Sequence, residues 1–178
     1  MGRHNLLMNF LSWIRSIFMT SPAPRIIHGP GFDVEVDGPD LLLRNVIATA
    51  FGGGHDKGDD GQTESGVLND GSNPKLMGCA LPIRSTESAT APSPLTSSGP
   101  HIPWGTKVRF WAAGADESTA IECVLIDNGP DVKVYPNHAA DLCVYPASLF
   151  SPRIPIKQMA NVFEAHVNIR IVNGASFI

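Results

Sequence analysis

An all-β fold, built as a small closed barrel, is the architecture that the sequence predicts. Six to eight short segments are apolar or alternate between apolar and polar residues, as β-strands do. The 178 residues include 17 Gly and 15 Pro, which exceeds average usage and indicates many turns and few long helices. A chain of this length is expected to form one domain around a single core. A small closed barrel is the economical way to arrange such strands.

Residues 1–24 are expected to precede the domain as an amphipathic helix and a linker. Apolar side chains recur there at helical spacing and would share one face: Leu6, Phe10, Trp13, Ile14, Ile17 and Phe18. Such a helix would dock on a partner or on the domain, and a degenerate export signal or membrane-surface anchor is the alternative. Asn9 and Arg15 interrupt the apolar run, which is too short to span a bilayer, and no cleavage site is obvious. Residues 22–24 and 28–31 are interpreted as linker because Pro and Gly recur.

The first half of the domain, which is expected over residues 32–172, contains two strand regions and a long loop. Residues 32–37 alternate apolar and acidic residues as a half-buried strand does, and Gly38 and Pro39 turn the chain. Residues 41–51 form one or two strands that run into three glycines. Residues 55–73 are polar and Gly-rich, which predicts a loop. Their aspartates lack the register of a calcium-binding loop, so that site is not predicted.

The second half is expected to supply the remaining strands. Residues 76–82 form a short strand, and residues 85–100 are a flexible Ser/Thr/Pro-rich insertion. After a turn at residues 102–105, Val108 and Phe110 alternate with polar partners as a strand. Residues 114–118 form a hairpin turn into the strand 121–127. A short helical turn is expected at residues 146–150, and a last strand at residues 162–172 closes the domain.

Charge and cysteine usage narrow the function classes. The net charge of −4, with scattered Lys and Arg, gives no basic stripe, so nucleic acid is not an expected partner. Cys79, Cys123 and Cys143 fit neither a zinc spacing nor an even disulfide framework. One bridge with a leftover thiol and three reduced buried thiols both remain open. His55 and His101 lack a paired spacing, so no metal is expected, and His166 is interpreted as structural.

Two aspartates stand out as candidates for chemistry. The apolar run that begins at Cys123 ends on Asp127 and is cut off by residues 128–130, which predicts a buried strand that places a carboxylate at its C-terminal edge. Asp141 lies within a weakly polar segment, either exposed beside an apolar run or partly buried. Two aspartates from neighbouring segments are the minimum for acid/base work on a glycosidic bond. The alternatives are a turn residue for Asp127, and a capping or backbone-bonding role for Asp141.

Six motifs in order resemble the double-psi β-barrel proteins that act on cell-wall polysaccharides. That group includes rare-lipoprotein-A-like and "3D"-domain lytic transglycosylases, family-45 endoglucanases and expansins. The resemblance covers about residues 46–150 and implies a six-stranded double-psi β-barrel with long loops and an N-terminal helical extension. The motifs are Ala48-Thr-Ala-Phe-Gly-Gly, Thr63-Glu-Ser-Gly66, Ala80-Leu-Pro82, Ile102-Pro-Trp-Gly-Thr-Lys-Val108, Ile126-Asp-Asn-Gly-Pro130 and His138-Ala-Ala-Asp-Leu142.

The resemblance also implies roles for individual residues. Asp141 is the general acid that protonates the glycosidic oxygen, Asp127 a second carboxylate that orients or stabilises, and Thr49 a hydrogen-bond partner. A general acid must keep its proton near neutral pH, and burial beside apolar residues favours that form. A lytic transglycosylase manages with one such group because the sugar's own hydroxyl attacks, whereas a hydrolase needs a second carboxylate. Further substrate-binding positions implied by the resemblance are Phe51, His55, Asp56, Trp104, Tyr135 and His138, and loop residues Asp56, Asp59 or Asp60 could supply the second carboxylate.

The expected partner is a polysaccharide, peptidoglycan or cellulose-like, and no cofactor is expected. The resemblance favours a secreted or cell-envelope location. A non-catalytic, expansin-like carbohydrate-binding or structural module is the alternative function, and a phage or secretion-associated structural protein is a weaker third. Trp104 and Trp111 are interpreted either as sugar-stacking platforms or as buried anchors. The buried-anchor interpretation is favoured, because Trp111 lies in a strand that alternates into the core.

Overall fold

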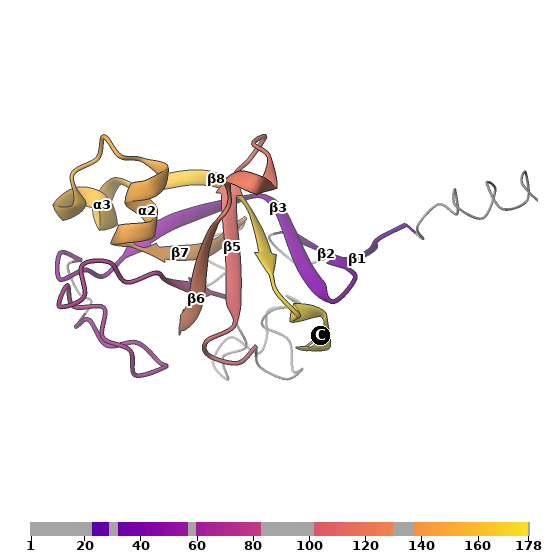
Figure 1. Ribbon diagram of the computed structural model, residues 1–178, viewed down its shortest axis with the longest axis horizontal. Coiled ribbons are helices and arrows are strands. Elements are labelled where there is room, and N and C mark those ends of the chain that lie inside the picture. Colours follow the sequence, from indigo (N-terminus) through magenta and orange to yellow (C-terminus); the bar gives the residue numbers. More distant parts are fainter. Residues whose placement is uncertain (1–22, 29–31, 57–59, 83–101, 130–136, 178) are drawn as a thin grey trace, which may run out of the picture.

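The computed structural model describes residues 23–28, 32–56, 60–82, 102–129 and 137–177, and these form an eight-stranded sheet (Figure 1). Two short α-helices and two 3₁₀ turns accompany the sheet. The strands are β1 (Arg25–His28), β2 (Asp33–Asp37), β3 (Asp40–Phe51), β4 (Gly78–Leu81), β5 (Lys107–Ala112), β6 (Ile121–Asn128), β7 (His138–Cys143) and β8 (Glu164–Ile171). The helical elements are α2 (Val144–Phe150), α3 (Ile156–Val162), η1 (Glu117–Thr119) and η2 (Gly174–Phe177).

Six of these strands close into a barrel. The strand order is β1-β2-β3-β7-β4-β6-β5-β8, and β3 pairs with β8 as well, so the sheet returns on itself. The prediction of a mostly β structure with a closed barrel and little helix is confirmed. The pairs β3–β7 and β4–β6 are parallel and the others antiparallel. The barrel is therefore not a simple up-and-down arrangement of consecutive hairpins.

The barrel interior is filled by one side of each strand. In β3, Leu41, Leu43, Val46, Ala48 and Ala50 belong to the buried core, whereas the residues between most of them are more exposed. This is the period-two pattern that a strand with one buried face produces. Burial of apolar surface at about 25 cal/mol per Å² is the main stabilising term of such a core.

The helices α2 and α3 lie together at one end of the barrel (Figure 1). Ala147 of α2 and Met159 of α3 are buried and belong to the same core as the strands. The expected helical turn at residues 146–150 is confirmed and begins two residues earlier. The expected start of the last strand at Val162 is wrong, because Val162 ends α3 and the strand begins at Glu164. The apparent alternation there came from a helix end joined to a strand start.

Three irregularities in register decide which side chains face outward. In β3 the register shifts between Leu43 and Val46, where Asn45 has a φ of 51°. In β6 the pairing passes from Leu125 to Asp127, and in β7 from His138 to Ala140, so one residue in each strand has no partner. Such a bulge moves the following residues to the other face of the strand.

Strand β1 lies between the two segments interpreted as linker and shares His28 with the second of them. Arg25–His28 pairs with β2 in an antiparallel register, and the His28 ring lies 3.0 Å from the Asp33 carboxylate. Proline and glycine flank this short strand, which hid it from sequence reading. The predicted N-terminal helix within residues 1–22, the whole insertion 85–100 and Tyr135 lie outside the described residues. Within the described ranges, no helix has the length and apolar character needed to cross a bilayer.

The three cysteines are buried thiols, so the reduced alternative describes the structure. Burial raises the pKa of the Cys123 thiol from 9.0 to about 12, and the neighbouring Glu122 carboxylate adds to the shift. Burial, together with the nearby thiols of Cys123 and Cys143, raises the pKa of Cys79 well above 9.0. Both thiols therefore stay protonated in the folded state at a pH where an unfolded chain would ionise them.

We expect the free energy of unfolding to fall as the pH rises from 9.0 towards about 12. The unfolded thiols lose their protons in this window while the folded ones keep them, so the unfolded state is favoured by about 1.4 kcal/mol per pH unit for each thiol. Urea titrations across this window measure the slope. The Cys123→Ala variant should show a shallower slope than the unsubstituted chain, and equal slopes would contradict the assignment.

Candidate functional site

A row of outward-facing residues crosses the barrel wall where the parallel and antiparallel strands meet. Thr49 of β3 pairs with Asp141 of β7, Asp141 pairs with Ala80 of β4, and Ala80 pairs with Asp127 of β6. Directly paired residues point to the same face of a sheet. Their sequence neighbours Ala48, Ala50, Ala140 and Leu142 belong to the buried core, so the row lies on the outer face. The two predicted aspartates thus lie in one row, separated by a single strand.

Thr49, His138 and Asp141 form a hydrogen-bonded cluster within this row. The Thr49 hydroxyl donates to Oδ1 of Asp141. Nε2 of His138 lies 3.0 Å from the Thr49 Oγ1 and 3.1 Å from the same Asp141 Oδ1. The His138 and Asp141 side chains are only 15% and 20% exposed, respectively. The sequence-predicted Thr49, His138 and Asp141 are therefore brought together in a partly water-excluded setting.

The bulge in β7 is what lets His138 and Asp141 meet. Two residues three apart in a regular strand point to opposite faces. Because Ala139 has no partner in β3, His138 and Asp141 instead share the outer face. The i, i+3 spacing in the sequence therefore gives a contact only through this local irregularity.

The cluster surrounds the Asp141 carboxyl group with groups that can exchange protons. The Thr49 hydroxyl has one proton, which it donates to Asp141. Nε2 of His138 faces both oxygen atoms, and the tautomer of the ring sets whether it donates or accepts in each contact. The arrangement places an ionisable carboxyl group beside one hydroxyl group and one imidazole nitrogen. It can position Asp141 and move a proton to or from it.

Asp127 has a different environment from Asp141. Its Oδ1 accepts hydrogen bonds from the backbone N–H groups of Asn128 at 2.8 Å and Glu64 at 3.1 Å. The bond from Glu64 ties the end of β6 to the loop of residues 60–68. Asp127 also lines an open polar hollow whose other walls are Asp60, Gln62, Thr63, Glu64, Gly66 and Asn128.

The Gly-rich loop is locked onto the end of β3 by a buried amide. Asn69 is 3% exposed; its side chain donates to the carbonyl of Phe51 and accepts from the N–H of Gly53. Gly52 has a φ of 71°, and a Cβ atom there would lie 2.0 Å from the Asn69 amide. Only glycine permits both this backbone conformation and this close approach. Sequence reasoning did not single out Asn69, because one Asn among the many polar residues of this loop has no distinguishing pattern.

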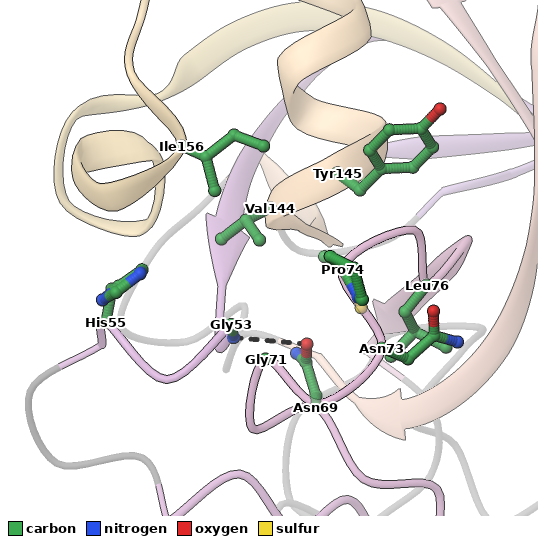
Figure 2. Close-up of a pocket in the computed structure, with 11 residues that line it drawn as sticks. Gly53, His55, Asn69, Gly71, Asn73, Pro74, Leu76, Val144, Tyr145 and Ile156 are labelled. Carbon is green, nitrogen blue, oxygen red and sulfur yellow. Dashed lines mark hydrogen bonds between the residues drawn. The ribbon is translucent and has the colours of Figure 1, made fainter.

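A pocket of about 140 Å³ lies beside the cluster, between this loop and the helices (Figure 2). Cys143 lines it and lies two residues beyond Asp141 in β7, so both face outward about 7 Å apart. Val144, Tyr145 and Ile156 form the helix side, and Asn69 and the loop glycines form the opposite side (Figure 2). The remaining lining residues are His55, Asn73, Pro74 and Leu76. Its volume is close to that of engineered cavities of about 150 Å³ that bind benzene.

The other sequence-predicted positions are spread more widely. Phe51 is half-buried next to the pocket, paired with Cys143, and His55 lines the pocket. Asp56 follows His55 and makes no hydrogen bond or ion pair with the part of the chain that the structure describes. Trp104 lies in the turn before β5 and is 41% exposed, whereas Trp111 is 4% exposed, so the buried-anchor interpretation holds for Trp111 only.

Glu164 is the residue of this face that sequence reasoning missed. It is exposed, begins β8 and pairs with Thr49 on the side opposite to Asp141. Its place outside the predicted motifs gave no functional signal, although the alternation of β8 does put it on the outer face. Among the described side chains, no group of three or more His, Cys, Asp or Glu residues is arranged to hold a metal ion.

No protein-family model matches the sequence, and no curated protein matches it.

Proposed function

We propose that this chain cleaves glycosidic bonds in a cell-wall polysaccharide, with Asp141 as the general acid. We further propose that its barrel is of the double-psi type. The two parallel pairs β3–β7 and β4–β6 support this assignment, because a meander of consecutive hairpins has none. The Thr49–His138–Asp141 cluster carries the functional proposal.

The cluster supplies what protonation of a leaving group requires. Asp141 is held by two neighbours yet keeps 20% of its side chain exposed, so one edge remains open to a ligand. Thr49 and His138 restrict its rotation, and a fixed proton donor avoids the cost of orienting it during the reaction. Proton transfer by a positioned group contributes about 10²- to 10⁴-fold in rate.

The adjacent pocket supports a polysaccharide as substrate. It begins at Cys143, two residues after Asp141 in β7, and has room for one ring-sized group. None of the described residues that line it has a carboxylate, amine or guanidinium side chain. The ionisable groups among them are the His55 imidazole, the Tyr145 hydroxyl and the Cys143 thiol. A neutral sugar unit or neutral substituent suits such a lining better than a phosphate or carboxylate, which needs paired charge.

The direct test uses purified full chain with peptidoglycan and with carboxymethyl-cellulose. We expect a loss of turbidity or viscosity with at least one of them. New reducing ends would identify hydrolysis, whereas cleavage without new reducing ends would identify attack by the sugar's own hydroxyl. Retention on either polymer without any cleavage would refute the enzyme and support the carbohydrate-binding module instead.

We expect Ile156→Trp to raise KM about tenfold with little change in kcat, which corresponds to about 1.4 kcal/mol of binding. Ile156 lines the pocket at the start of α3 and is 43% exposed, so a larger ring can fill the pocket without disturbing the core. Initial rates over a range of polymer concentrations measure both constants. Val162→Trp is the matched control, since Val162 is 57% exposed on the same helix and does not line the pocket. Equal KM values for the two variants would show that the pocket does not bind the substrate.

A further inference from the structure

Glu164 continues the outer row that contains the cluster. Thr49 pairs with Asp141 on one side and with Glu164 on the other. The residue after Glu164, Ala165, packs against the core, as expected if Glu164 points outward. The exposed carboxylate of Glu164 therefore shares one barrel face with Thr49 and Asp141.

We propose that Glu164 is the second catalytic carboxylate of this site, the group that takes the proton from the attacking hydroxyl. The inference rests on the proposed glycosidic cleavage and names the base that this reaction needs. Neighbouring strands are about 4.8 Å apart, so the Cα atoms of Asp141 and Glu164, two strands apart, are separated by roughly 10 Å. Carboxyl groups that act as acid and base on opposite sides of a bond lie about 6.5–9.5 Å apart, against about 5–5.5 Å for an acid and a nucleophile.

Asp127 lies equally far from Asp141 on the other side, but the two carboxylates differ in what holds them. Oδ1 of Asp127 bonds two backbone N–H groups and secures the loop to β6. Within the described residues, no hydrogen bond or ion pair engages the Glu164 carboxylate, and its longer side chain can swing towards Thr49. A base needs an accessible carboxylate within reach of the attacking group, which selects Glu164.

The proposed step is balanced by the two carboxyl groups. The bond between the anomeric carbon and the glycosidic oxygen breaks as Asp141 transfers its proton to that oxygen. The oxygen of water, or of the sugar's own hydroxyl, forms a new bond to the anomeric carbon, and Glu164 accepts the proton released. Asp141 ends deprotonated and Glu164 protonated, so exchange with solvent restores both groups.

The test compares Glu164→Gln with Asp141→Asn on peptidoglycan and carboxymethyl-cellulose. We expect Glu164→Gln to lower the rate about 10²- to 10⁴-fold. Sodium azide should restore cleavage by this variant, because the azide ion attacks without releasing a proton and forms a glycosyl azide. Azide should not restore Asp141→Asn. Dinitrophenyl glycosides of chitobiose and cellobiose, whose leaving group needs no proton, should restore Asp141→Asn but not Glu164→Gln.

Glu122→Gln is the matched control, since Glu122 is an exposed strand residue paired with Lys107 and away from the row; it should keep full activity. Glu164→Asp, with a base one methylene shorter, should keep part of the activity at an unchanged melting temperature. Full activity of Glu164→Gln, or a loss of activity that azide does not restore, overturns the inference about Glu164. The proposed function still stands in that case if Asp141→Asn is inactive. An unsubstituted chain that cleaves neither polymer overturns the proposed function and this inference with it.

Discussion

Replacing Asp141 by Asn is expected to lower polysaccharide cleavage about 10²- to 10⁴-fold while leaving the melting temperature nearly unchanged. The amide has the shape of the carboxyl group, and its oxygen can still accept from the Thr49 hydroxyl, so the cluster keeps its packing. It has no acidic proton for the leaving oxygen. Reducing-end or turbidity assays, beside thermal melts of the same samples, separate the chemical effect from a folding effect.

Asp33→Asn is the control for this change. Asp33 lies on β2 and is 59% exposed, and its carboxylate pairs with the exposed His28 ring, so the same substitution there should leave the rate unchanged. Equal rates for the unsubstituted chain and for Asp141→Asn would remove Asp141 from the mechanism. A large fall in melting temperature for Asp141→Asn would instead make it a structural residue.

Arg170→Met is expected to give the largest loss of stability among the surface charges. The Arg170 guanidinium is 16% exposed and bonds Glu117 through two nitrogens, at 2.8 and 3.0 Å, and Asp37 and Asp40 at 2.8 and 3.2 Å. Glu117 and the other two carboxylates raise the pKa of Arg170 further above its usual value, against the opposing effect of burial. The network ties β8 to η1 and to the hairpin of β2 and β3.

Methionine would keep the packing of the Arg170 stem but remove this cation from Asp37 and Asp40 and leave Glu117 paired with Arg109. Removing one partner of a buried ion pair costs about 3–5 kcal/mol, and the partial exposure of this network reduces the expected loss to about 2–3 kcal/mol. For a domain of this size the melting temperature should fall by roughly 5–10 °C. Arg44→Met is the comparison, because Arg44 is 59% exposed and, within the described residues, pairs with the single carboxylate of Glu35, so its loss should stay below about 1 kcal/mol. Similar losses in both variants would show that the Arg170 network adds nothing beyond a surface pair.

The strand content was predictable because its signals are local, and a closed barrel was predicted only as the economical way to arrange such strands. Alternation in β2, β5 and β8 and the apolar runs of β3, β4 and β6 each follow from one face packing on the core. Helix α3 was missed because Ile156 and Val162 are exposed apolar residues on a short helix, so its pattern marks no buried face. Strand β1 was missed because four residues between Pro and Gly segments give too short a window.

Within the candidate site, the sequence singled out Thr49, His138, Asp127 and Asp141 through motif order, and three of these four form the hydrogen-bonded cluster. It assigned Asp141 as the general acid and Asp127 as a second carboxylate that orients or stabilises, but it could not say which contacts make the two differ. Their difference arises from contacts with backbone N–H groups in the loop and with side chains of other strands, and these contacts join residues more than 60 positions apart. Sequence spacing carries no information about such partners.

The sequence by itself determined a mostly β structure with a barrel core, because periodicity and turn residues are encoded within a few positions of one another. Only the tertiary structure decided the row that holds Glu164, Thr49, Asp141, Ala80 and Asp127. The bulges at Ala139 and Ile126 place the residues that follow them on the opposite face from the one that strict alternation along the strand predicts. Barrel closure brings β8 beside β3. A shift of one residue in register moves every later side chain to the opposite face, so the site exists only once all the strands have paired.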